Sequence, residues 1–216
     1  MAKSADLEFF FDPVCPWAWV TSRWVHNVRD QRGYEVVWRP ISLWVINEET
    51  SAGWYTPEYR AGHFFGHRGL RIADAIRDNE PDAHAVGHWY TTLGTAIHTD
   101  GRRSEARDDA DGFLAEMLAD AGFDAGYLAA ADDEGRDVAI RASSAEAFSR
   151  TGDGVGTPIL TFHPGTEREA SFFGPVISKA PQGEEALRLW DAVETLATMS
   201  GLAELKRSNR HRLDFT

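Results

Sequence analysis

The only cysteine of this chain, Cys15, lies where a strand-like sequence gives way to a helical one. Residues 7–11 are rich in aromatic side chains and predict a buried strand, which Asp12 and Pro13 end. Pro16 suits the first turn of a helix, because its missing N–H would have no partner there. At a helix N-terminus the unpaired N–H groups and the helix dipole favour thiolate over thiol. We therefore expect Cys15 to be a partly exposed nucleophile with a lowered pKa.

The residues that follow Cys15 predict a redox site that lacks the usual second cysteine. A lone cysteine is more often a small buried side chain than a catalyst. Here, however, the order of strand, Cys-Pro-aromatic and helix is typical of Cys-x-x-Cys oxidoreductases. Pro16 and Trp17 fit that pattern, whereas position 18 holds Ala18 in place of the second, resolving cysteine. Any redox mechanism must therefore use a single protein thiol.

A second candidate site is the segment Gly156-Thr157-Pro158, at the start of a predicted strand. Proline is tolerated there because a first strand position needs no ladder hydrogen bond. In thioredoxin-like proteins this position holds a cis-proline, and the preceding residue offers its backbone to a substrate strand beside the active cysteine. We expect a cis Thr157-Pro158 bond close to Cys15.

A group of aromatic residues between positions 44 and 59 forms the third candidate. Aromatic side chains at a junction between elements are as often core as binding residues. Their concentration in a segment with several loop-forming residues favours the wall of a cleft for a flat substrate. The candidate substrate-binding residues are Trp17, Trp44, Asn47, Trp54, Tyr55, Tyr59 and Gly156.

The elements that must position these residues predict an α/β fold. In chain order they are a strand at 7–11, a helix at 16–29 ended by Gly33, a strand at 34–41, strands at 158–162 and 170–173, and a helix opened by Gln182-Gly183-Glu184. The first three form a βαβ unit with a parallel strand pair, and the later strands form a hairpin. Between the two halves strand signals disappear and helical stripes recur.

This order predicts a thioredoxin-like domain with an inserted all-helical domain. Residues 1–55 and 151–216 are assigned to the discontinuous thioredoxin-like domain, and residues 56–150 to the helical insert. We find no sequence repeat and no low-complexity segment. The chain length of 216 residues is sufficient for this organisation.

Charge and composition limit which kinds of molecule the protein is expected to bind. The net charge of −12 argues against nucleic acid or an anionic membrane as partner, because both need basic patches. The N-terminal stretch 1–6 lacks the apolar region of a secretory signal, and no stretch is apolar enough to span a bilayer. A single cysteine also fits a reducing compartment. We expect a cytoplasmic protein that binds small molecules, with a homodimer left open.

Other motifs predict no further chemistry. The pairs His63/His67 and His84/His88 have helical spacing but lack the glutamate of H-E-x-x-H and any cysteine, so no metal is expected. The glycine-rich segment 152–156 precedes a strand, whereas phosphate loops follow one. The basic tail at 204–212 is either a solvated end or a segment that docks near an acidic surface.

With these motifs the chain resembles the DsbA-like branch of the thioredoxin superfamily, and within it the actinobacterial mycothiol-dependent nitroreductases. The C-P-x-x and T-P motifs identify the superfamily, and the C-terminal blocks are more particular to this branch. The matching segments are 11–17, 21–24, 155–158, 173–176, 183–191 and 204–207.

The resemblance implies an enzyme that draws electrons from mycothiol, a small thiol, and reduces disulfides or nitroaromatic compounds in a cleft between two domains. Its catalytic residues are then Cys15, Pro16, Trp17, Ala18, Thr157 and Pro158. Ala18 departs from the family's C-P-W-C, so Cys15 cannot form an intramolecular disulfide. Either the natural protein works as a monothiol enzyme, or position 18 carries a Cys-to-Ala change.

Two alternatives from other classes stay open. Kappa-class glutathione transferases share this fold and only activate a thiol cofactor, which agrees with a missing second cysteine, although they typically have serine where Cys15 stands. A redox-inactive binding protein would keep the cleft without turnover. Only the reductase requires a covalent adduct on Cys15.

Overall fold

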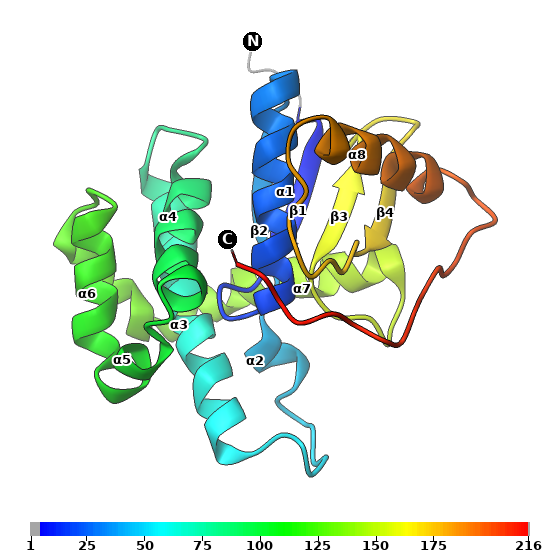
Figure 1. Ribbon diagram of the computed structural model, residues 1–216. Coiled ribbons are helices and arrows are strands. Elements are labelled where there is room, and N and C mark those ends of the chain that lie inside the picture. The colour runs from blue at the N-terminus through cyan, green and yellow to red at the C-terminus, as the bar shows by residue number, and fades with distance from the viewer. Residues whose placement is uncertain (1–4, 216) are drawn as a thin grey trace.

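The computed structural model describes residues 5–215, which build a four-stranded sheet flanked by helices (Figure 1). The strand order is β2-β1-β3-β4; β1 and β2 are parallel, and the other two pairs are antiparallel. The strands are β1 (Leu7–Phe11), β2 (Val36–Pro40), β3 (Ile159–Phe162) and β4 (Ala170–Phe173). The predicted βαβ unit and hairpin are confirmed.

Helices cover both faces of this sheet. On one face α1 (Pro16–Arg32) packs beside α8 (Gly183–Ala197), and the indole of Trp24 donates a hydrogen bond to the Ala186 carbonyl at 2.9 Å. On the other face α7 (Asp137–Thr151) packs against β2 and β4. This three-layer arrangement buries the sheet between helices.

The alternation of side chains along β1 explains the two cores. Leu7, Phe9 and Phe11 lie in the large core that includes Trp24. Phe10 points to the opposite face and joins the smaller core beneath α7. Successive side chains of a strand point to opposite faces of the sheet. The run Phe9-Phe10-Phe11 therefore makes both faces of β1 apolar at its carboxyl end. That end leads directly to Cys15.

Between β2 and β3 the chain is helical, as predicted. The elements are α2 (Leu43–Ile46), α3 (Pro57–Asn79), α4 (Ala85–Gly94), a π-helical turn η1 (Thr95–Thr99), α5 (Arg103–Asp108), α6 (Ala110–Asp120), and the 3-10 turns η2 (Ala125–Asp132) and η3 (Glu134–Arg136). Among the described residues no helix combines the length and the apolar character that crossing a bilayer requires.

The division into domains at residues 56 and 150 stays a prediction. Helix α7 lies within the predicted insert and contacts α3, yet it also packs against the sheet. We propose that it links the two units. The N-terminal stretch from which a cytoplasmic location was predicted includes residues 1–4, which lie outside the described residues.

Candidate active site

Cys15 occupies the N-cap of α1, as the sequence predicts. Its sulfur accepts a hydrogen bond from the backbone N–H of Ala18 at 3.4 Å, and its S–H donates to the carbonyl of Thr157 at 3.6 Å. Pro16 is the first helical residue. The thiol is therefore held between one helix terminus and one loop that is remote in sequence.

Neighbouring strands bring that loop to Cys15. The β1 and β3 strands pair in antiparallel register, with Phe10 opposite Ile159. The Thr157-Pro158 peptide bond just before β3 is cis, and the Thr157 hydroxyl donates to the Phe10 carbonyl at 3.3 Å. The structure thus places the two strongest motifs of the sequence in direct contact.

The electrostatic setting of Cys15 contradicts the expectation of an exposed thiol with a lowered pKa. Only 5% of the residue is exposed, and burial raises the pKa of the thiol to about 12. The Ala18 N–H lowers this pKa, whereas the nearby Asp12 carboxylate raises it further. Desolvation outweighs the helix terminus, because a thiolate loses its hydration when it is buried.

Asp12 has a structural role that the sequence did not reveal. From the sequence it was expected only to end a strand. Its buried carboxylate accepts hydrogen bonds from the backbone N–H groups of Val14, at 2.9 Å, and Leu43, at 2.7 Å. Burial raises its pKa to about 7. A Cβ at Gly66 of α3 would lie 2.8 Å from Asp12 Oδ1, so only glycine lets α3 approach this loop. Asp12 thus fixes the Cys15 loop to α2.

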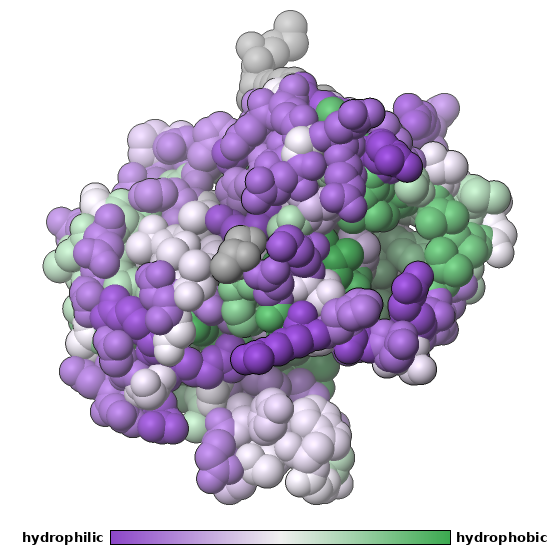
Figure 2. All heavy atoms as spheres, in the orientation of Figure 1, coloured by the Kyte–Doolittle hydropathy of each residue, from purple (hydrophilic) through white to green (hydrophobic). Residues whose placement is uncertain are grey.

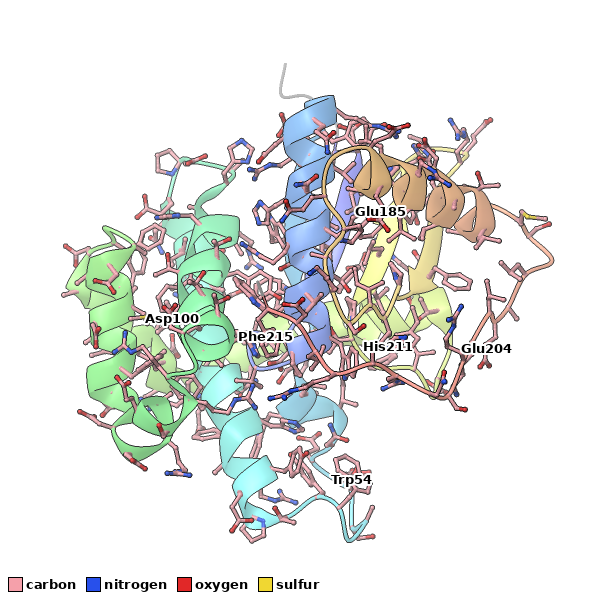
Figure 3. All side chains as sticks on the ribbon, viewed as in Figure 1. Trp54, Asp100, Glu185, Glu204, His211 and Phe215 are labelled. Carbon is pink, nitrogen blue, oxygen red and sulfur yellow. The ribbon has the colours of Figure 1, made fainter. Side chains whose placement is uncertain are left out.

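The predicted aromatic wall forms a cluster around the start of α3. Trp54 packs against Tyr55 at 5.4 Å and Tyr59 at 6.2 Å between ring centroids, and the Tyr55 hydroxyl lies 3.2 Å from His63 Nδ1. Trp54 and Tyr59 are 55% and 57% exposed, and Trp54 lies on an outlying loop (Figure 3). Large exposed aromatic side chains are suited to contacts with a flat ligand.

The other predicted binding residues have different surroundings. The Asn47 amide donates to the Leu43 carbonyl at 2.9 Å and so closes α2. Trp44 packs against Phe64 at 5.0 Å. Gly156 lies in the loop before Thr157, and a Cβ added there would lie 4.0 Å from Phe173, an ordinary van der Waals contact. Their role in binding stays a prediction.

Two residues beside Cys15 were missed by the sequence reasoning. His98 Nε2 donates to the Pro13 carbonyl at 2.8 Å, and Arg103 donates to His98 Nδ1 at 3.3 Å. Burial lowers the pKa of His98 to about 3, so the ring is neutral. The charge of Arg103 lowers the pKa of Cys15. No periodicity or motif marks these residues, because only the tertiary fold brings η1 and α5 to this loop.

The C-terminal segment crosses the same region. The Arg210 guanidinium lies 5.0 Å from the ring centroid of Trp17, and the Phe215 ring lies 5.8 Å from that of His98. The backbone N–H of Asp214 donates to the Ser178 carbonyl at 2.7 Å. Figure 3 shows this segment running from Glu204 past His211 to Phe215, and the front face of the molecule that it crosses is largely hydrophilic in Figure 2. The tail therefore docks on the molecule beside Trp17.

The histidine pairs have separate partners. His67 lies between the Ser42 hydroxyl, 2.9 Å from Nδ1, and the Asp137 carboxylate, 2.8 Å from Nε2. His63 contacts Tyr55, and His88 Nε2 donates to the Ala121 carbonyl at 3.0 Å. Ser42, His67 and Asp137 are fixed in a network that links α2, α3 and α7.

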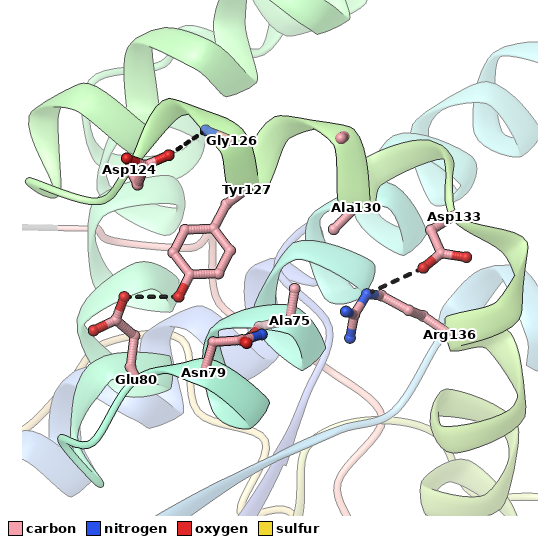
Figure 4. A pocket seen from close by; sticks show the side chains of 10 residues that line it. Ala75, Asn79, Glu80, Asp124, Gly126, Tyr127, Ala130, Asp133 and Arg136 are labelled. Atoms are coloured by element: carbon pink, nitrogen blue, oxygen red, sulfur yellow. Dashed lines mark hydrogen bonds and ion pairs between the residues drawn. The ribbon is translucent and has the colours of Figure 1, made fainter.

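A cavity lies apart from this site, in the helical region. It has a volume of about 520 Å³ and contains the hydrogen bond from Tyr127 to Glu80, at 2.7 Å (Figure 4). None of the residues predicted to act in catalysis or binding lines it. The cavity is therefore separate from the thiol chemistry.

Comparison with known proteins agrees with this geometry. A relative from Mycobacterium tuberculosis, the uncharacterized protein Rv2286c, is 33% identical over 202 residues, which cover 93% of this chain and 81% of the relative. The cytosolic disulfide reductase DsbM from Pseudomonas aeruginosa, solved with glutathione, has a TM-score of 0.57 and 15% identity, covering 88% of this chain and 99% of its own. DsbA from Proteus mirabilis has a TM-score of 0.50 and 14% identity, covering 91% of each chain.

The structural neighbours show that the fold is DsbA-like and thioredoxin-related, as predicted. A sequence model of a protein family matches residues 14–207 and includes both Cys15 and Pro158. That family is described as Rv2466c-like, after the mycothiol-dependent nitroreductase Rv2466c. This chain therefore belongs to the Rv2466c-like family of thiol-dependent oxidoreductases.

Proposed function

We propose that this protein is a cytoplasmic, mycothiol-dependent reductase that acts through the single thiol of Cys15. Disulfides are its first class of acceptor, and nitroaromatic compounds are the second. The observation that carries the proposal is the contact of Cys15 Sγ with the Thr157 carbonyl, at the N-terminus of α1, in a chain of this family.

Each residue of the site has a role in this proposal. Cys15 is the nucleophile, and Pro16 begins the helix whose N-terminus faces the sulfur. The Ala18 N–H holds the sulfur in place. The cis Thr157-Pro158 segment presents its backbone to the acceptor. The flat part of the acceptor is bound by aromatic and polar residues around the site, which are Trp17, Asn47, Trp54, Tyr55, Tyr59 and Gly156.

Reduction of a disulfide then proceeds by thiol exchange. The Cys15 thiolate attacks one sulfur of the acceptor, forms a mixed disulfide and expels one thiolate. A mycothiol thiolate attacks the Cys15 sulfur and expels the second acceptor thiolate. Another mycothiol attacks the mycothiol sulfur of the adduct, which releases Cys15 and mycothiol disulfide. Two mycothiols thus lose two electrons, and the acceptor gains two electrons and two protons.

The buried thiol must be uncovered before this reaction. Because burial raises the pKa of Cys15 to about 12, few molecules hold a thiolate at neutral pH in the conformation described. When solvent or substrate reaches the sulfur, the desolvation penalty falls while the Ala18 N–H remains in place. Acceptor binding and thiol activation are therefore coupled in this proposal.

Intact-mass analysis after incubation with mycothiol disulfide tests the proposal. The reductase is expected to gain one mycothiol on Cys15, and added mycothiol should remove it. Cys15→Ser is the control and should gain nothing, because serine offers no thiolate. An unmodified wild-type protein would instead favour a kappa-class-like transferase or a redox-inactive binding protein.

A further inference from the structure

The arginines of this protein fall into two groups according to their partners. The chain carries 34 acidic and 22 basic residues, so carboxylates are in excess. Most arginines in the described part of the chain form an ion pair, and buried examples such as Arg71 with Asp137 are bidentate. Arg103 and Arg210 form no ion pair with any described residue, although both lie beside the Cys15 loop.

The position of Arg103 is fixed without neutralising its charge. Its guanidinium donates to His98 Nδ1, and His98 Nε2 donates to the Pro13 carbonyl, two residues before Cys15. Because Nε2 must carry the ring proton, Nδ1 can only accept, and the histidine stays neutral. The field of Arg103 reaches both Cys15 and Tyr59. Arg103 thus provides a positive charge near both the thiol and Tyr59 of the aromatic cluster.

Arg210 provides a second positive charge from a distant part of the chain. It lies over the face of Trp17, two residues after Cys15, and a cation–π contact leaves the N–H groups at the edge of the guanidinium free to bind. The segment around it is held by the bond from Asp214 to Ser178 and by the packing of Phe215 on His98. His98 therefore contacts both Arg103 and Phe215, which belongs to the segment that carries Arg210.

Local charge decides which molecules this site attracts. The net charge of −12 repels anions at long range, but charges farther than about 8 Å are largely screened at physiological ionic strength. At contact distance the two arginines dominate, and a guanidinium binds a planar carboxylate with two hydrogen bonds. Mycothiol has no ionised group besides its thiol, so it does not account for these cations.

We propose, on the basis of the reductase function above, that the acceptor reduced at Cys15 carries a carboxylate, which Arg103 and Arg210 bind. The acceptor is a small organic disulfide that carries a carboxylate. Its carboxylate lies between the two guanidinium groups while its reactive atoms meet the Cys15 sulfur. The electrons follow the thiol exchange described above, and the carboxylate takes no part in the chemistry.

Alkylation of Cys15 tests this proposal independently of turnover. Iodoacetate and iodoacetamide react with the same thiolate and differ in charge, so the ratio of their rates cancels the pKa of Cys15. Since the chain has one cysteine, intact mass reports this site alone. Relative to the urea-unfolded protein, the folded wild type should favour iodoacetate, and R103Q and R210Q should each lower the ratio by about tenfold at physiological ionic strength.

Arg188 offers a matched control. It is exposed on α8 and also has no ion pair among the described residues, so R188Q should leave the ratio unchanged. Added salt should lower the wild-type ratio toward that of R103Q. A ratio that is equal in wild type, R103Q and R210Q would overturn the proposal.

Two acceptors that differ only in charge test the same preference in the reductase reaction. With mycothiol as donor, 3,3′-dithiodipropionate should be preferred to its uncharged diamide, and R103Q and R210Q should each lose that preference, measured as the ratio of kcat/KM for the two acceptors. Equal reduction of both acceptors by wild type would overturn the inference and leave the reductase intact. A folded wild type that reduces neither acceptor and forms no mycothiol adduct would overturn the proposed function, and with it this inference.

Discussion

The sulfur of Cys15 lies 3.6 Å from the carbonyl oxygen of Thr157, although the two residues are separated by 142 positions in the sequence. The antiparallel pairing of β1 with β3 creates this contact, since Cys15 follows the carboxyl end of β1 and Thr157 precedes the amino end of β3, which lie at the same edge of the sheet. The contact stabilises the protonated thiol, because a carbonyl can only accept a hydrogen bond. This one relationship connects the fold, the chemistry and the pH dependence of the site.

The reactivity of Cys15 should rise with pH well beyond the range of an ordinary thiol. Burial raises its pKa to about 12, so the native alkylation rate should still be increasing at pH 10. Rates with iodoacetamide, followed by intact mass from pH 7 to pH 10, measure this, and a cysteine peptide provides the reference. A plateau near pH 7 would show a lowered pKa and contradict the structure.

Ala18→Cys should form an intramolecular disulfide with Cys15 upon oxidation. The backbone N–H of residue 18 contacts the Cys15 sulfur at 3.4 Å, and both residues are in the first turn of α1, so a bridge needs little backbone movement. The oxidised variant should lose two hydrogen atoms by mass and no longer react with alkylating agents.

The same variant should turn over faster with mycothiol, because the second cysteine can resolve the mixed disulfide. Cys15→Ser combined with Ala18→Cys is the control. Reductase activity retained in that double variant would remove Cys15 from the mechanism.

Asp12 should make the stability of the protein depend on pH. Burial raises its pKa from 3.8 to about 7, so the folded state holds a proton that the unfolded state releases above pH 4. This stabilisation is complete below pH 4 and is lost as the pH rises toward 7. Compared with Asp12→Asn, the wild-type free energy of unfolding should fall by on the order of 2–4 kcal/mol between pH 4 and pH 8.

Urea denaturation of both proteins at each pH measures this difference. Because the side-chain amide of the Asp12→Asn variant cannot titrate, the subtraction isolates the carboxyl group. A difference that stays constant with pH would mean that Asp12 titrates normally in the folded protein.

Gly66→Ala should destabilise the protein and disturb the Cys15 loop. The added Cβ would lie 2.8 Å from both Asp12 Oδ1 and Val14 Cγ2, and overpacking of this kind typically costs about 1–3 kcal/mol. Thermal unfolding measures the cost, and faster alkylation of Cys15 would report the displaced loop.

Gly62→Ala on the same helix is the matched control. Nothing lies within 4 Å of a Cβ at that position, so alanine should stabilise α3 by roughly 0.5–1 kcal/mol. If both variants were equally stable, the close approach of α3 to Asp12 would not constrain the fold.

Local patterns in the sequence were sufficient for the elements nearest to Cys15. The strand at 7–11, the helix begun by Pro16 and the hairpin before the last helix all occur as predicted, because periodicity and helix capping act over a few residues. Gly33 ends α1 at φ 65°, a backbone conformation for which glycine is favoured. The position of the thiol followed from these features.

The tertiary structure alone decided how reactive that thiol is. The helix terminus predicted a lowered pKa, whereas the packing of the surrounding loops removes water from Cys15 and raises it. Desolvation depends on every element packed around a group, and sequence spacing does not encode it. For the same reason Arg103 and Arg210 could not be assigned to the site until the fold placed an inserted helix and the C-terminal segment beside the Cys15 loop.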